Sequence, residues 1–205
     1  MKVQSLLGIA ALSLVAANAQ AQNLPLDPGP DYPPLSLFST FSNDGYNSFR
    51  GTVFQANNSF TVVGADLWTA APSSGLNATF ELYEVVNTNG NVLAGATLLG
   101  SFGATLTGPI GWYGGDFAAG IPLSAGSNYF VRAGYQEAAD ENWFFEFDPL
   151  VFGHAPSNIG DVTIIDGTLG GDTGNFVMPF LNLRVPAPSS AALLGLAGLA
   201  LRRRR

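Results

Sequence analysis

The sequence predicts an all-β fold, an antiparallel β-sandwich of jelly-roll type, for the middle of the chain. Short runs alternate with the two-residue period of a strand: Phe80 and Leu82 face one way, for example, and Glu81 faces the other way, towards solvent. Clusters of Gly, Asn, Asp, Ser and Pro separate these runs, and such spacing is typical of sandwiches and jelly rolls. Residues 23–185 show no convincing helical period, so the prediction is β throughout.

The expected strands cover residues 60–68, 80–85, 97–106, 110–118, 127–136, 142–147, 161–166 and 176–185. The expected turns lie at residues 72–75, 87–91, 114–116 and 125–128. Before them, residues 23–36 contain five prolines and little periodicity, which indicates an extended lead-in. We assign one sandwich domain to residues 37–184, because about 150 residues suffice for one hydrophobic core.

Residues 1–22 have the pattern of a secretory signal peptide. Lys2 precedes an apolar stretch at residues 6–17, and two overlapping small-x-small cleavage sites follow at residues 17–21. The apolar stretch predicts a signal helix. We therefore expect the chain to be exported through the inner membrane.

Residues 185–205 combine a proline motif, an apolar run and a basic end. The motif is Val185, Pro186, Ala187 and Pro188, and the basic end is Arg202, Arg203, Arg204 and Arg205. Arginines after an apolar helix act as a membrane stop, because a guanidinium is costly to move into hydrocarbon. The apolar run at residues 190–201 is short against the roughly 20 residues of a full span. A short apolar helix of this kind suits a signal read by an enzyme; a plain membrane anchor is the alternative.

This three-part tail resembles the PEP-CTERM sorting signal of Gram-negative bacteria, with Ala187 where the family usually has Glu. The resemblance implies processing by an exosortase-like membrane protease, transient contact with the inner membrane through the C-terminal helix, and delivery to the cell surface or beyond. Upstream, the element formed by Leu123, Gly126 and Tyr129 resembles jelly-roll surface domains that often precede such tails. These domains share no established activity, so this second resemblance implies architecture alone.

Composition narrows the classes of partner. Residues 23–185 hold three arginines, no lysine and all fifteen carboxylates of the chain, a formal net charge of −12. Nucleic-acid binding needs Lys and Arg to neutralise phosphates, so we exclude nucleic acid as a partner. The chain has no cysteine, which removes disulfides and thiol catalysis.

Catalytic motifs are weak. His154 is the only histidine, lies in a Gly/Pro-rich stretch and has no Gly-x-Ser-x-Gly motif to accompany it; one histidine also cannot build a zinc site. A glycoside hydrolase would need two converging carboxylates, and the candidates are Glu81, Glu84, Glu137, Glu141 and Glu146. We therefore expect no enzyme, with a glycan hydrolase as the less favoured alternative.

The sequence offers candidates for two kinds of ligand site. Calcium prefers oxygen ligands in loops, and the candidate ligands are Asp140, Glu141, Asn142, Asp166 and Asp172. The alternative is that these are solvated turn residues, so calcium is a candidate cofactor and no cofactor is certain. Sugars are often held by aromatic faces, and the candidates are Trp112, Tyr113 and Trp143; the alternative is that these rings fill the core.

The sequence thus predicts an exported, non-catalytic protein with a structural or adhesive role at the cell surface or in the extracellular matrix. A carbohydrate-binding module, with polysaccharide as its partner and with or without calcium, is the main alternative.

Overall fold

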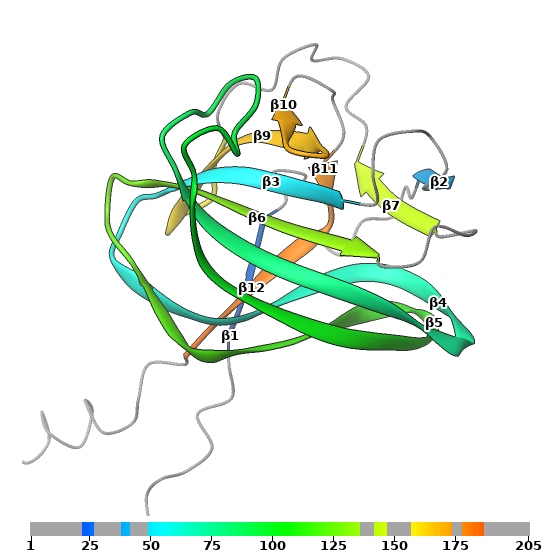
Figure 1. Cartoon of the computed structure of the whole chain (residues 1–205). Helices are drawn as coiled ribbons and strands as arrows, with labels where there is room; N and C mark the ends of the chain where they lie inside the picture. Colours follow the sequence, from blue (N-terminus) through cyan, green and yellow to red (C-terminus); the bar gives the residue numbers. More distant parts are fainter. Residues whose placement is uncertain are drawn as a thin grey trace, which may run out of the picture. The chain divides into compact units, whose positions relative to one another are not determined.

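The computed structural model describes residues 22–26, 38–41, 49–135, 142–146, 157–173 and 178–186 (Figure 1). The chain divides into two units, Asn23–Val185 and the pair of terminal segments Met1–Gln22 and Pro186–Arg205. The predicted signal helix and the predicted C-terminal apolar helix lie outside the described residues.

The described part of the unit Asn23–Val185 is all-β and contains no helix. Its strands are β1 (Gln22–Pro25), β2 (Phe38–Phe41), β3 (Phe49–Ala56), β4 (Phe60–Val85), β5 (Thr97–Leu123), β6 (Asn128–Tyr135), β7 (Asn142–Glu146), β8 (Ser157–Asn158), β9 (Val162–Leu169), β10 (Asp172–Thr173), β11 (Met178–Pro179) and β12 (Leu181–Val185). The first residues of the Pro-rich lead-in thus form a strand, β1. The next residue, Leu26, is fully buried and donates its backbone N–H to the carbonyl of Leu181 at 2.8 Å.

The strands form two sheets. The larger has nine strands in the order β1-β12-β4-β6-β3-β9-β10, with β5 on β4 and β8 on β9; the smaller has the order β11-β7-β2. The pairings with a described register are antiparallel, as the sequence predicts. The nine-stranded sheet curls into an open half-barrel (Figure 1).

The curl follows from the two longest strands, β4 and β5, which pair along nearly their whole length. The first half of β4 has β12 as its other neighbour, whereas residues 78–85 have β6. The long hairpin bends between these halves and brings the two ends of β5 together. A Cβ atom added at Gly100 would lie 2.6 Å from Cδ1 of Ile121, although the two residues lie about 20 positions apart along the same strand.

The main core lies on the concave side of this bend. Phe80 stacks on Phe102 with ring centroids 4.7 Å apart, and Phe117 meets Phe102 edge-on at 5.1 Å. Phe80 and Leu82 are both fully buried, which confirms the predicted alternation. Burial of such a side chain stabilises the fold by about 1.5–3 kcal/mol.

Two of the predicted turns are wrong. Residues 72–75 and 114–116 lie within β4 and β5, not between strands. At the first, Ala71 pairs with Gly108 and Leu76 with Leu106, so extra residues of β4 form an irregularity where the hairpin bends. At the second, Gly114 allows close strand approach, because a Cβ there would lie 2.0 Å from the carbonyl oxygen of Ala65. The turn signals at 87–91 and 125–128 are confirmed as connections.

The sequence reasoning also missed β3. This strand lies between β6 and β9 and is buried along most of its length. A strand buried on both faces does not alternate between apolar and polar residues, so the two-residue period that revealed the other strands is absent there.

We predict that Gly114→Ala lowers the free energy of unfolding towards the upper end of the roughly 1–3 kcal/mol range for overpacking, because the new methyl group meets backbone that cannot rotate away. The matched control is Gly103→Ala on the same strand, where the nearest atom to a new Cβ is 3.9 Å away; its change should stay within about 0.5 kcal/mol. Urea unfolding measures both. Equal effects of the two substitutions would contradict this account of the close approach.

Candidate functional site

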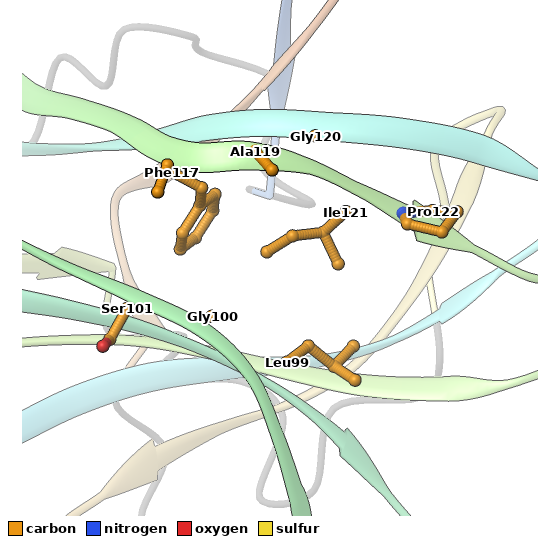
Figure 2. A pocket seen from close by; sticks show the side chains of 9 residues that line it. Leu99, Gly100, Ser101, Phe117, Ala119, Gly120, Ile121 and Pro122 are labelled. Atoms are coloured by element: carbon orange, nitrogen blue, oxygen red, sulfur yellow. The ribbon is translucent and has the colours of Figure 1, made fainter.

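A cleft of about 420 Å³ opens between the two ends of β5. Its lining residues are Leu99, Gly100, Ser101, Phe117, Ala118, Ala119, Gly120, Ile121 and Pro122. Figure 2 shows Phe117 and Ile121 extending from one stretch of β5 across the gap towards the stretch that carries Gly100. Ser101 supplies the one polar side chain of this lining, and no lining residue is ionisable. The cleft therefore suits apolar contact and contains no acid or base.

A bulge in β5 forms one wall of this cleft. Val62 pairs with Ile121 and Gly64 with Asp116, so the stretch of β5 between these pairs is longer than the stretch of β4 that it opposes. The surplus, at residues 117–120, turns Phe117 into the core and leaves the next three residues exposed.

The strongest polar contacts lie next to this bulge, across β12, β4 and β5. Arg184 donates from Nε to Oδ2 of Asp66 at 2.8 Å and from Nη2 to Oδ1 at 2.5 Å, and from Nη1 to Oδ1 of Asp116 at 3.0 Å. The Asp66 side chain is 7% exposed and that of Asp116 is 68% exposed. The hydrogen bonds to Asp66 are the main reason that the pKa of Arg184 lies above its usual value. The bidentate pair joins β12 to β4, and the bond to Asp116 adds β5.

A second polar cluster links β4, β6 and β3. Arg132 donates from Nε to Oε2 of Glu81 at 2.6 Å and from Nη2 to the Tyr83 hydroxyl at 3.2 Å, and its guanidinium lies 4.1 Å from the ring centroid of Phe49. Tyr83 in turn donates to Glu81 at 2.9 Å. Burial, and then this hydrogen bond, raises the pKa of Tyr83 above its ordinary value.

Glu81 therefore lies on the face opposite Phe80 and Leu82, as predicted, yet it is not freely exposed to solvent, because Arg132 and Tyr83 cover it. Glu84 is exposed and three residues further along β4, so the two carboxylates point to opposite faces of the strand. They do not converge as a hydrolase pair. Glu137, Glu141 and His154 lie outside the described residues, and the side chain of Glu146 on β7 is not described.

The predicted aromatic residues do not share one surface. Trp112 pairs with Trp68 across β4 and β5, their ring centroids 5.3 Å apart and edge-on, and both are half-buried. Tyr113 lies on the opposite face, packs against the main core and donates its hydroxyl to the carbonyl of Pro109. Trp143 belongs to β7 in the smaller sheet, and its side chain is not described. Of the three candidates, Trp112 is the one described on a face away from the main core.

The candidate calcium ligands are not gathered either. Asp140 and Glu141 lie outside the described residues, and Asn142 begins β7 with its side chain undescribed. Asp166 accepts a hydrogen bond from the N–H of Gly167, while Asp172 pairs with Leu169, roughly 10 Å along β9 from Asp166. In the part of the chain that the structure describes, no group of three or more His, Cys, Asp or Glu residues is placed to hold a metal ion.

The structure describes the first two residues of the predicted sorting motif. Val185 ends β12, and Pro186 follows it and is exposed. Ala187, Pro188 and the arginines at 202–205 lie outside the described residues. Among the residues described, no helix is long and apolar enough to cross a membrane.

Comparison with known proteins finds no matching family model and no curated protein similar to this chain.

The sequence reasoning missed both arginine clusters. Asp66 and Arg184 are 118 residues apart, so no local pattern joins them. One signal was available in the composition: residues 23–185 hold three arginines against fifteen carboxylates, so each arginine has an excess of carboxylates with which to form an ion pair.

We predict that Asp66→Asn lowers the free energy of unfolding by about 2–3 kcal/mol, somewhat less than the roughly 3–5 kcal/mol typical of a fully buried pair, because Arg184 keeps partial access to water. The matched control is Asp116→Asn, which removes an exposed partner of the same arginine and should change stability by about 0–1 kcal/mol. Urea unfolding of both variants tests the ranking. An Asp116→Asn effect as large as that of Asp66→Asn would overturn it.

Proposed function

We propose that this chain is an exported, non-catalytic protein with a structural or adhesive role at the cell surface or in the extracellular polysaccharide matrix of a Gram-negative bacterium. The observation that carries the proposal is the pair of terminal patterns, a signal-like segment at residues 1–22 and a PEP-CTERM-like tail at residues 185–205. The partner that processes the tail is an exosortase-like protease. A jelly-roll sandwich between the two segments is part of this proposal.

The contacts of the described polar groups support a non-catalytic role. The Arg132 and Arg184 clusters hold neighbouring strands together, and the lining of the β5 cleft contains no ionisable group. General acid–base catalysis needs a positioned titratable group at the reacting atoms, and this cleft offers none. An apolar cleft and an acidic exterior suit a protein that acts through its surface.

Processing of the tail tests the proposal directly. We expect full-length chain expressed in a Gram-negative host with an exosortase to reach the surface or medium as a product without peptides beyond about residue 185. Pro186→Ala combined with Pro188→Ala should leave the tail attached, because it removes the motif. The matched control, Pro28→Ala with Pro30→Ala in the lead-in, should be processed normally. Mass spectrometry reads out all three; surface protein that keeps its terminal arginines would contradict the sorting proposal.

A carbohydrate-binding module is the second candidate, and Trp112 is the observation that favours it. Its ring is half-buried beside Trp68, on the face of β5 opposite Tyr113, and so offers an aromatic edge on the outer side of the hairpin. Exposed carboxylates are among the polar groups that sugar hydroxyls pair with. Asp116, on the same side of β5, is such a group.

In this second case, we expect Trp112→Ala to abolish saturable binding to a polysaccharide, the producer's own included, while the melting transition persists. Tyr113→Phe is the matched control, because it alters the neighbouring aromatic residue on the core side and should leave binding unchanged. Titration calorimetry with and without calcium measures both. Absence of binding by the unaltered chain would leave the structural role as the sole proposal.

A further inference from the structure

The described chain has one long segment without charge. Between Glu84 and Asp116 there is no Asp, Glu, Lys or Arg, although residues 23–185 carry a net charge of −12. This segment comprises the loop after β4 and most of β5. Asp116 itself is paired with Arg184. In a molecule whose exterior is otherwise acidic, β5 is thus a neutral strip.

The same segment carries the exposed apolar side chains. In the described residues, the large hydrophobic side chains that are exposed are Val86 at 73%, Leu98 at 50% and Ile110 at 43%. All three lie within the uncharged segment. Single exposed apolar residues are ordinary. Here, however, all three lie in the one long segment without charge, which makes this segment the candidate contact region of the described residues.

The backbone of this strip is also open to pairing. Within the described residues, β5 pairs with β4 and no other strand. Sheet edges are usually protected by charges, proline or bulges. β5 has Pro109, Pro122, the bulge at 117–120 and a one-residue bulge at Leu99. Residues 97–107 have neither a charge nor a proline, and residues 100–106 of this stretch pair with β4 in regular register. The outward positions here are small: Gly103 and Thr107 are exposed, and a new Cβ at Gly103 would meet no atom closer than 3.9 Å.

We propose that the free edge of β5 at residues 97–107 pairs with the same edge of a second copy of this chain. Strand addition at an open edge gains main-chain hydrogen bonds, and an isologous contact of this kind is antiparallel about a two-fold axis. The uncharged segment would also bring Leu98 and Ile110 near the partner, burying apolar area that one copy leaves exposed.

A second copy fits this edge because of charge. Residues 23–185 of each copy carry a net charge of −12, so two copies repel each other across acidic surface. The β5 strip is described surface where their approach brings no carboxylates together. A cationic partner would find no charge on this strip to pair with. This inference goes beyond the proposed function and does not depend on export, since self-association is measured on the purified chain.

Sedimentation of the full-length chain tests the proposal over a range of roughly 1 µM to 1 mM, since a contact of one strand edge belongs to the small, weak class of interfaces. We expect a reversible dimer that strengthens with added salt, because salt screens the repulsion between the two acidic copies. The test variant is Gly103→Glu with Thr107→Glu, which places carboxylates from both copies along the two-fold contact; its association constant should fall at least about tenfold.

The matched control is Ser124→Glu with Ala125→Glu, which adds the same charge at exposed connection residues outside the edge and outside the uncharged segment. It should dimerise as the unaltered chain does, and thermal melts should show that both variants fold. Three results would overturn the proposal: an unaltered chain that stays monomeric throughout the range, equal association of the two double variants, or association that weakens with salt. Equal association would assign the contact to another segment, the apolar tail included.

Discussion

The bidentate pair between Arg184 and Asp66 is the contact around which the polar groups of β12, β4 and β5 are arranged. It joins β12 to the first half of β4, whereas β6 pairs with the second half, residues 78–85. A nearly buried carboxylate loses its hydration, and only good geometry with further hydrogen bonds compensates for that loss. Here the second carboxylate, Asp116, supplies a further acceptor, and Gly64 and Gly114 provide room. A Cβ on Gly64 would lie 3.1 Å from the Arg184 side chain, and one on Gly114 would lie 2.7 Å from Asp66.

The positions of the arginines determine how charge is distributed over the surface of the described unit. With Arg132 and Arg184 bound to carboxylates and Arg50 almost fully buried, little positive charge reaches the surface of the described unit. Anionic partners such as phosphates are repelled as a consequence. The same distribution concentrates neutral, apolar surface on β5, because the only charge on that strand, Asp116, is engaged with Arg184. The Arg184–Asp66 pair and the uncharged strip of β5 thus both follow from where the arginines and carboxylates lie.

Local alternation predicted the all-β class and the inward face of β4 at Phe80 and Leu82 correctly, because a half-buried strand has a two-residue period. It could not predict that the strand runs on each side of residues 72–75 form a single bent strand, since the bend is set by the change of partner from β12 to β6. It also left Trp112 and Tyr113 as equal candidates. Only the register, with Trp112 opposite Trp68, separates the outer ring from the core ring. Pairing between segments far apart in the sequence determines the bend and the face on which each ring lies, and a local pattern contains no information about that pairing.

Repulsion between acidic copies opposes self-association, whereas the open edge of β5 favours it. The concentration of the chain therefore determines how much of it is paired. Free in solution, copies whose residues 23–185 carry a net charge of −12 repel, so a contact that buries one strand edge stays weak. Copies crowded at a shared surface would experience a much higher effective concentration, and confinement of this kind can strengthen a weak contact by orders of magnitude without any new interaction. An edge that remains unpaired while copies are dilute, and pairs only where they are crowded, would make assembly depend on the local concentration of the chain.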